Sequence, residues 1–272
     1  RFISGYQNAM TPNPCIDGNR FIKFEKLLSR TQLLGCNYIS TGHYGIIAYD
    51  AAAERYYLKK AKDQTKDQTY ALYSLTQNQL SKTLLPLGGL TKNEVRDIAR
   101  ENRFINAKKP DSQDICFVPN GDYHSFIEEY TGQRIAAGDF VDASGTVLGT
   151  HKGITNYTIG QRKGLGIAFG KPMYVCAKDQ QTNTVTLGEE RELYSKRLMA
   201  DDVNFIAVNE LKAPLKVKAK VWYNMIEKDA VVHPIENGQI LLVFDQPHRA
   251  VASGQAVVLY DGDIVIGGGT IK

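Results

Sequence analysis

Two of the four cysteines stand in distinctive polar settings far apart in the chain. Cys15 follows the run Thr-Pro-Asn-Pro at residues 11–14, and Cys116 follows the run Asp-Ser-Gln-Asp-Ile at residues 111–115. The thiolate form of cysteine is a strong nucleophile, so two such residues brought together by folding could pass sulfur between molecules. The pattern predicts sulfur chemistry in a site assembled from distant parts of the sequence.

The setting of each of these cysteines leaves two interpretations open. Prolines on both sides of Asn13 restrain the backbone before Cys15, and a rigid surface loop suits a reactive thiol as well as it suits a residue without a role. Cys116 lies between Ile115 and Phe117, which is also typical of a buried strand cysteine. Two lysines upstream would activate its thiol, and two nearby aspartates oppose them.

The other two cysteines, Cys36 and Cys176, lie in apolar runs and are predicted to be core residues. No Cys-x-x-Cys pair occurs in the chain, which argues against a zinc ribbon and against a thiol oxidoreductase. We expect no metal site.

Two further segments could bind a ligand. Residues 152–166 combine four glycines with Lys, Arg and Gln side chains, a composition that can bring backbone N–H groups and cations to phosphates. A glycine-rich connection between strands explains the same composition, because no Gly-Lys-Ser/Thr ending marks a P-loop. His43 follows a predicted strand, where ligands gather in open α/β sheets, although a single histidine is more often structural.

The elements that must position these residues change in type along the chain. Apolar residues from Phe21 to Leu34 repeat with helical spacing, and Gly35 is a stop signal. Residues 36–40 are typical of a short buried strand, a helix is expected from about Ser74 to Leu84, and Thr91 begins a capping box. Alternating helices and strands predict an α/β layer.

From about residue 132 the pattern becomes that of β structure. Residues 216–221 alternate strictly between charged and apolar, as in a half-buried strand. Apolar runs at 240–244, 256–260 and 264–266 are separated by turn signals. A small β-barrel at the C-terminus fits this spacing.

Length and composition indicate a globular protein with two or three domains. The chain has 272 residues, of which 43% are hydrophobic and 23% charged. No apolar run reaches the roughly 20 residues that span a bilayer, and no signal-like segment opens the chain. Four cysteines do not make a secreted disulfide framework, so a cytoplasmic location is expected. The net charge of +4 permits a polyanionic partner.

Several segments together resemble the tRNA-specific 2-thiouridylase family, the MnmA/TrmU proteins. They keep the family's order and cover nearly the whole chain, which makes the match highly specific. The matching runs are Thr-Pro-Asn-Pro at 11–14, Asn19 with Ile-Lys-Phe at 22–24, Thr-Gly-His-Tyr at 41–44, Lys-Asp-Gln-Thr-Tyr at 66–70, Leu-Pro-Leu-Gly at 85–88, Asp-Ser-Gln-Asp-Ile-Cys-Phe at 111–117, residues 157–166, and Ser-Gly-Gln-Ala at 253–256.

The resemblance implies an enzyme that replaces the C2 oxygen of the wobble uridine in tRNA with sulfur. ATP, with Mg²⁺, adenylates that oxygen, and a cysteine persulfide loaded by a sulfur-carrier protein then delivers sulfur to C2. A second cysteine discharges the persulfide through a disulfide bond. The chemistry agrees with general principles, because uridine C2 is a poor electrophile and the base must leave the anticodon stack to react. The implied substrates are tRNAs of the Glu, Gln and Lys type, and no membrane partner is implied.

The resemblance also implies a fold and a role for each matching residue. The fold is α/β, part of a Rossmann-like PP-loop ATP pyrophosphatase domain at 1–131, followed by a β-rich tRNA-contacting domain at 132–195 and a β-barrel at 196–272. Cys116 matches the persulfide cysteine. The other implied residues are Gly42 at ATP, with His43 as the site residue beside it; Gln255 at a site near the anticodon; Asn13, Pro14 and Cys15 at the target base; and Lys66, Asp67, Gln68, Trp222 and Tyr223 at the tRNA.

The chain departs from the family pattern in two places. The family's second cysteine precedes Asn19, where this chain has Gly18. Either Cys15 replaces it, or an external thiol discharges the persulfide, or the protein binds tRNA without thiolating it. Gly18 also argues against an iron–sulfur cluster on this loop.

The second departure is a missing loop. The family's Ser-Gly-Gly-x-Asp-Ser loop, which holds the pyrophosphate of ATP, is not in the sequence, and the chain begins with Arg1. We therefore expect an N-terminally truncated nucleotide domain that cannot adenylate uridine alone.

Overall fold

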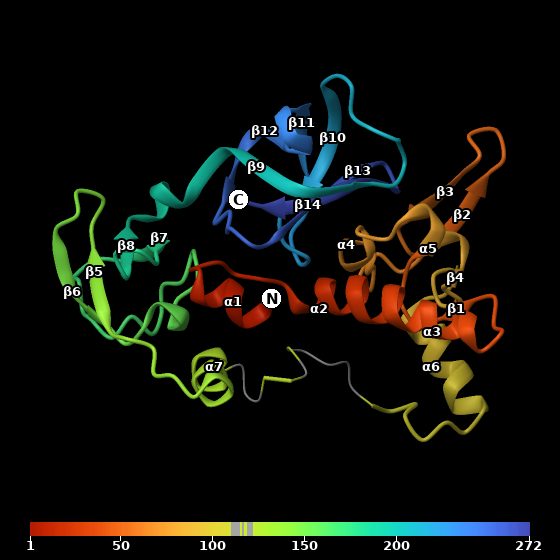
Figure 1. The fold of residues 1–272 in the computed structure, drawn as a ribbon, viewed down its shortest axis with the longest axis horizontal. Coiled ribbons are helices and arrows are strands. Elements are labelled where there is room, and N and C mark those ends of the chain that lie inside the picture. Colours follow the sequence, from red (N-terminus) through yellow and green to blue (C-terminus); the bar gives the residue numbers. More distant parts are fainter. Residues whose placement is uncertain (110–114, 116, 119–121) are drawn as a thin grey trace.

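The computed structural model describes residues 1–109, 115, 117–118 and 122–272. Figure 1 shows three parts: an α/β layer, a four-stranded sheet at the opposite end, and a β-barrel above and between them. The first helices run beneath the barrel and connect the other two parts. Cys116 lies outside the described residues, so its predicted position stays a prediction.

The first helical stretch extends from Pro14 to Leu33 with little interruption. It begins after Asn13, whose side chain accepts from the backbone N–H groups of Cys15 and Ile16, and Pro14 occupies the first helical turn, where its missing N–H costs nothing. The stretch buries Phe24 and Leu28, while Leu33 stays 79% exposed. Its elements, with the short helix that precedes them, are α1 (Phe2–Gln7), α2 (Pro14–Asp17), the π-helix η1 (Gly18–Leu27) and α3 (Leu28–Leu33).

Besides the first helical stretch, the described part of the α/β layer contains a parallel pair of very short strands and three further helices. The strands pair Ile39 with Thr83 and Ser40 with Leu84. The predicted capping box is confirmed, since Thr91 and Glu94 exchange both of its hydrogen bonds. The elements are β1 (Ile39–Ser40), β4 (Thr83–Leu84), α4 (Thr69–Leu72), α5 (Gln77–Ser81) and α6 (Lys92–Glu101).

The central part is a four-stranded sheet with a short helix beside it. Its strand order is β6-β5-β8-β7, and its core contains Phe140, Tyr157 and Val185. The helix packs on it through His124, whose Nδ1 lies 3.0 Å from Thr155 Oγ1. The elements are α7 (Tyr123–Thr131), β5 (Gly138–Val141), β6 (Val147–His151), η3 (Ile154–Asn156), β7 (Tyr174–Asp179) and β8 (Thr184–Gly188).

The C-terminal part is a closed antiparallel barrel, as the sequence predicted. Its ring runs β13-β10-β11-β12-β9-β14 and closes through the pairing of β13 with β14. The hairpin of β2 and β3 extends the sheet from β14. The elements are β2 (Ile46–Asp50), β3 (Arg55–Lys59), η4 (Glu190–Leu193), β9 (Tyr194–Phe205), β10 (Leu215–Lys220), β11 (Lys228–Pro234), η5 (Glu236–Gly238), β12 (Ile240–Arg249), β13 (Ala256–Asp261) and β14 (Ile264–Ile271).

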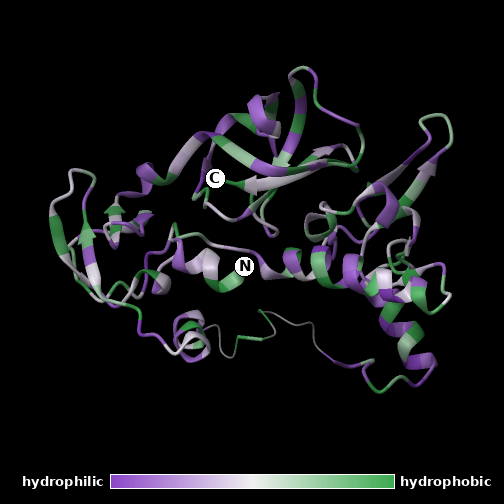
Figure 2. Cartoon of the chain, viewed as in Figure 1, coloured by the Kyte–Doolittle hydropathy of each residue, from purple (hydrophilic) through white to green (hydrophobic). Residues whose placement is uncertain are grey.

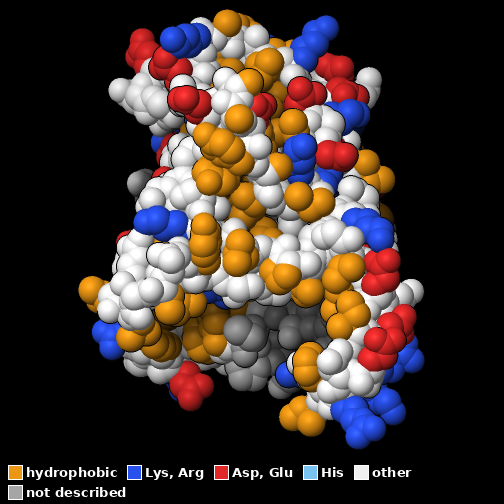
Figure 3. Space-filling view, turned by 90° about the vertical axis from the view of Figure 1, so that its right-hand side faces the viewer, with side chains coloured by type: hydrophobic (Ala, Val, Ile, Leu, Met, Phe, Trp, Pro, Cys, Tyr) orange, Lys and Arg blue, Asp and Glu red, His pale blue; other side chains and the backbone are white. Residues whose placement is uncertain are grey.

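Apolar residues are distributed unevenly between these parts. Alternation along the barrel strands, visible in Figure 2, places residues such as Leu242 and Val257 in the interior with no exposure. The α/β layer instead leaves Leu34, Phe104 and Ile105 largely exposed. Figure 3, which faces the side of the molecule that carries this layer, shows apolar side chains across its middle. The layer is therefore much less covered than the barrel.

Two local predictions were wrong. Cys36 is exposed and precedes the strand, because Gly35 adopts a φ of 74° and the Cys36 N–H still bonds to Thr31 in the last helical turn. The helix expected over 74–84 covers only α5, since Thr76 caps it and the chain then turns into β4. Cys176 is half-buried, so the expectation of a core position holds only in part.

Candidate functional site

The segment 10–18, here called the cysteine loop, is held by the barrel and the central sheet. Ser253 O accepts from the Thr11 N–H at 2.8 Å, and Gln255 Nε2 donates to Thr11 O at 2.6 Å. Gly254 makes this approach possible, because its φ is +85° and a Cβ there would lie 2.9 Å from the Met10 Cβ. The barrel therefore positions the loop through its backbone.

Two more contacts complete the support of the loop. Lys178 of the central sheet donates from Nζ to Met10 O at 3.5 Å, and burial lowers the pKa of Lys178 to about 8. On the helical side, Asn19 Nδ2 donates to Ala71 O at 3.0 Å. Elements from all three parts of the molecule thus meet at these few residues.

The geometry separates the residues that we predicted at this loop. Asn13 serves as a helix cap, and Cys15 is exposed in the first turn of α2. Gln255 is 3% exposed, and its side-chain amide donates a hydrogen bond to Thr11 O. Its side chain therefore holds the loop and faces away from solvent. Cys15 is the side chain of this group that faces outward.

The backbone conformation at Gly18 does not require a glycine. Its φ of −62° and ψ of −40° are ordinary helical values, and a Cβ built on it meets nothing within 4 Å. Residues three apart in a helix lie on one face, so Gly18 shares a face with Cys15. A thiol at position 18 would fit the fold without rearrangement.

A second group of predicted residues follows the carboxyl end of β1. Gly42 is exposed, and His43 is buried with its Nδ1 2.8 Å from Thr41 Oγ1. Burial, followed by the charge of Lys23, lowers the pKa of His43 to about 4, so the imidazole is neutral at pH 7. Its ring lies 5.8 Å from that of Phe24 on η1, which connects this group to the helix of Cys15.

The segment 66–68 and the turn that carries Trp222 and Tyr223 form a third group. Gln68 Oε1 accepts from the Tyr44 N–H at 2.9 Å, so this segment joins the His43 region. Burial raises the pKa of Asp67, whose carboxylate accepts from Thr69 Oγ1 at 2.6 Å. Tyr223 is 55% exposed, and Trp222 is half-buried.

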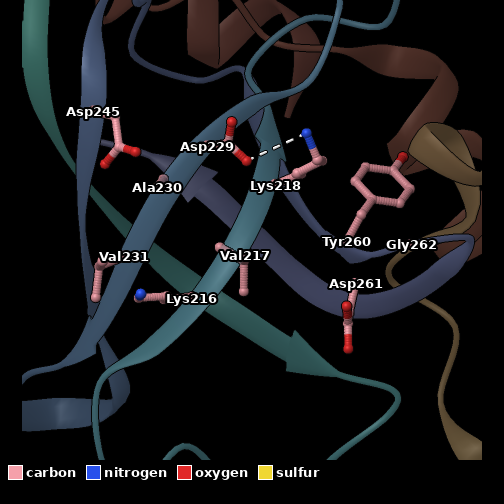
Figure 4. Close-up of a pocket in the computed structure, with 10 residues that line it drawn as sticks. All are labelled: Lys216, Val217, Lys218, Asp229, Ala230, Val231, Asp245, Tyr260, Asp261 and Gly262. Carbon is pink, nitrogen blue, oxygen red and sulfur yellow. Dashed lines mark ion pairs between the residues drawn. The ribbon is translucent and has the colours of Figure 1, made fainter.

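Two grooves lie elsewhere on the described surface. One of about 310 Å³ lies on the barrel between β10, β11 and β13, with Lys218, Asp229 and Tyr260 in its lining (Figure 4). The other, of about 340 Å³, joins Arg162 of the glycine-rich segment to Phe169 and Lys171. Predicted site residues line neither groove. The second brings cationic and apolar side chains together, and both interpretations of its segment stay predictions.

The described residues fit ATP better than an iron–sulfur cluster. Gly42 at the carboxyl end of a parallel strand leaves open backbone for a nucleotide such as ATP. An iron–sulfur cluster needs several thiolates, and Gly18 supplies none. Within the described ranges, no three His, Cys, Asp or Glu side chains gather as metal ligands. No helix among the same residues is long and apolar enough to cross a membrane.

Sequence reasoning missed the residues that support the cysteine loop from a distance. Arg20 forms a bidentate pair with Asp202 of β9, and Lys178 reaches Met10 from the central sheet. Each partner lies more than a hundred residues from the loop, so no local spacing could have indicated these contacts.

Three family models match consecutive parts of the chain. They are the tRNA methyl transferase HUP domain at residues 1–120, the tRNA methyl transferase PRC-barrel domain at 124–189 and the aminomethyltransferase beta-barrel domain at 195–271. Their order agrees with an α/β layer followed by two β-rich parts.

Curated relatives match the chain along its whole length. A protein of Acetivibrio thermocellus named tRNA-specific 2-thiouridylase MnmA is 55% identical over 271 residues, covering 100% of this chain and 76% of that protein. Relatives named in the same way from Thermoanaerobacter and Clostridioides difficile are 50% and 49% identical, again over 100% of this chain and over 74% and 75% of their own length. The chain spans about three quarters of these relatives.

Proposed function

Because the chain belongs to the MnmA/TrmU family of tRNA-specific 2-thiouridylases, we propose that it is a tRNA-uridine 2-sulfurtransferase. It converts the wobble uridine of tRNA to 2-thiouridine. The observation that carries the proposal is the cysteine loop, which presents Cys15 while the barrel and the central sheet hold its backbone. An exposed thiol on a rigid support is what transfer to a large substrate requires.

The reaction needs activation before sulfur transfer. Uridine C2 is a poor electrophile, and ATP makes its oxygen a leaving group by adenylation. The terminal sulfur of a Cys116 persulfide then bonds to C2, and AMP departs with the oxygen. A second thiolate attacks the inner sulfur and breaks the S–S bond, which leaves 2-thiouridine and a protein disulfide. An external dithiol must reduce that disulfide before the next turnover.

We assign the second thiol to Cys15. It lies three residues before Gly18 on the same helix face, and it is exposed. Discharge by an external thiol is the alternative for the same step. The two differ in whether a Cys15–Cys116 disulfide forms during turnover.

In this proposal, segment 66–68 and the turn that carries Trp222 and Tyr223 bind the tRNA. Lys66 contributes charge, and Trp222 and Tyr223 offer faces on which bases of the anticodon arm stack. Asn13 and Pro14 face the target base, and His43, neutral at pH 7, serves as a hydrogen-bonding group beside it. A sulfur-carrier protein loads Cys116, and the reaction takes place in the cytoplasm.

The test is chemical analysis of tRNA from cells that lack their own thiouridylase and carry the complete gene. Mass spectrometry of digested tRNA should detect 2-thiouridine at the wobble position, and the mass distinguishes a sulfur replacement from a methyl group. Cys116→Ser and Cys15→Ser should each abolish the product. Cys36→Ser removes another exposed thiol and should not. Product in Cys15→Ser cells would assign discharge to an external thiol.

A second candidate function is tRNA binding without thiolation, which Gly18 favours. Cells with the unchanged gene would then contain no 2-thiouridine, while the purified protein would still bind tRNA. Absence of both product and binding would overturn the proposal as a whole.

A further inference from the structure

We propose that Lys60, Lys220 and Glu227, here called the charge cluster, position the turn of Trp222 and Tyr223 against segment 66–68, so that the barrel and the α/β layer present one surface to tRNA. The inference rests on the proposed function and adds positioning residues to it. It is carried by a set of short contacts between β3, the ends of β10 and β11, and the buried Tyr260.

Glu227 is the centre of the charge cluster. It directly precedes β11 and therefore closes the turn that leaves β10. Lys60, which follows β3, places its Nζ 2.8 Å from Glu227 Oε1 and donates to Gly262 O at 2.9 Å. The side chains of Lys60 and Glu227 are only 10% and 13% exposed. Solvent screens this pair weakly, so it ties the turn firmly to the strand β3.

Lys220 holds the other end of the same turn. It ends β10, and its Nζ lies 3.8 Å from Glu227 Oε1 with the side chain 17% exposed. The Glu227 carboxylate thus pairs with Lys60 after β3 and with Lys220 at the end of β10. Without the Glu227 carboxylate, the ammonium groups of Lys60 and Lys220 would lie close together and largely shielded from solvent. Their repulsion would push the turn away from β3.

Tyr260 connects the cluster to segment 66–68. Its ring is fully buried, with the ammonium of Lys60 4.8 Å and that of Lys220 5.7 Å from the ring centroid. Its hydroxyl lies 3.3 Å from Thr69 Oγ1, which donates to Asp67 Oδ2 at 2.6 Å. The Asp67 carboxylate therefore points inward and anchors the segment that carries Lys66 and Gln68.

The same two strands provide a matched control. Lys218 of β10 pairs with Asp229 of β11 at 3.2 Å, but the two side chains are 51% and 66% exposed (Figure 4). Exposed pairs contribute little to structure. Asp229 and Glu227 thus carry the same charge two residues apart, and only Glu227 lies in the buried cluster.

The test compares Glu227→Gln with Asp229→Asn in tRNA binding by the full chain, using an unmodified transcript with a wobble uridine. Each change removes one negative charge next to a polyanion, and simple electrostatics predicts tighter binding for both. The positioning role predicts that Glu227→Gln binds about tenfold more weakly, while Asp229→Asn stays within about twofold of the unchanged protein. Equal or tighter binding by Glu227→Gln overturns the inference.

Trp222 gives a direct reading of the turn, because it is the single tryptophan of the chain. Glu227→Gln should shift its fluorescence emission in the protein without tRNA and reduce the change that tRNA causes. Asp229→Asn should leave both unchanged. An unaltered Trp222 spectrum in Glu227→Gln would contradict a positioning role, whatever the affinity.

A double variant keeps the test valid if Glu227→Gln alone does not fold. Lys60→Met with Glu227→Gln keeps the net charge and leaves no buried cation facing Lys220 across the turn, so it should fold even if the single change does not. It should lose as much affinity as Glu227→Gln alone, since the two residues act as a unit. Full affinity in the double variant overturns the inference. Absence of tRNA binding by the unchanged protein would instead reject the proposed function.

Discussion

The barrel and the α/β layer organise their backbones in opposite ways. The six strands of the barrel form a closed ring, so each has a partner on both sides, and the interior is filled by residues such as Leu242 and Phe244. The α/β layer has a parallel pair of two-residue strands and leaves Leu33, Leu34 and Ile105 exposed. The cysteine loop belongs to the layer by sequence, yet its backbone is bonded to the barrel. The closed barrel therefore supports, through hydrogen bonds to its backbone, a loop that belongs to the less covered layer.

Core truncation in the barrel should have the largest effect on stability. Leu242→Ala removes a side chain without exposure and should lower the free energy of unfolding by about 2–5 kcal/mol through lost burial and the cavity. Leu33→Ala, at a side chain 79% exposed, should change it by less than about 0.5 kcal/mol. Urea denaturation of both variants measures the contrast, and equal losses would refute it.

The contact between barrel and cysteine loop should matter for both stability and activity. Gln255→Ala leaves the buried Thr11 carbonyl without its donor and should cost about 1–3 kcal/mol of unfolding free energy. Cellular 2-thiouridine should fall as the loop loses its support. Gln32→Ala, at an exposed position of α3, is the control and should change neither quantity. Normal thiolation in Gln255→Ala would show that the barrel does not position the loop.

Lowering the pH should reduce the free energy of unfolding, because His43 is buried in its neutral form. Its pKa is about 4 in the folded protein, below the ordinary value of 6.5, so the unfolded chain takes up a proton first as pH falls. The stability present above pH 6.5 should therefore decline between pH 6.5 and 4, by about 2 kcal/mol at pH 5. Denaturation at pH 7 and pH 5 measures the loss. His43→Gln should lose less on the same shift, and an identical loss would assign the effect to other groups.

The ion pair between helix and barrel should have the smallest effect. Arg20 and Asp202 are 30% and 40% exposed, so Asp202→Asn should cost between about 0.2 and 1 kcal/mol. Asp202 has a φ of 47°, which asparagine tolerates, so the change isolates the charge. The difference from the unchanged protein should shrink in high salt. A loss as large as that of Gln255→Ala would make this pair a main support of the loop.

Local patterns predicted the elements whose signals lie within a few residues. The capping box at Thr91 and the alternation at 216–221 correspond to α6 and β10, because caps and side-chain alternation depend on neighbouring residues. Cys36 was misplaced because an apolar strand and the end of a helix look alike over five residues. The helix over 74–84 was too long because the pairing of β4 with β1, a non-local contact, ends it.

The candidate site divides in the same way. The thiol chemistry of Cys15 and the family membership follow from residue types and their order, since a thiol keeps its chemistry wherever the chain takes it. The roles of Gln255, Lys178 and Glu227 depend on contacts with residues 244, 168 and 167 positions away. Folding alone decides which of these groups meet and which are removed from water. For that reason Gln255 supports the loop from inside, and the largely buried Glu227 differs from the exposed Asp229 two residues later in the chain.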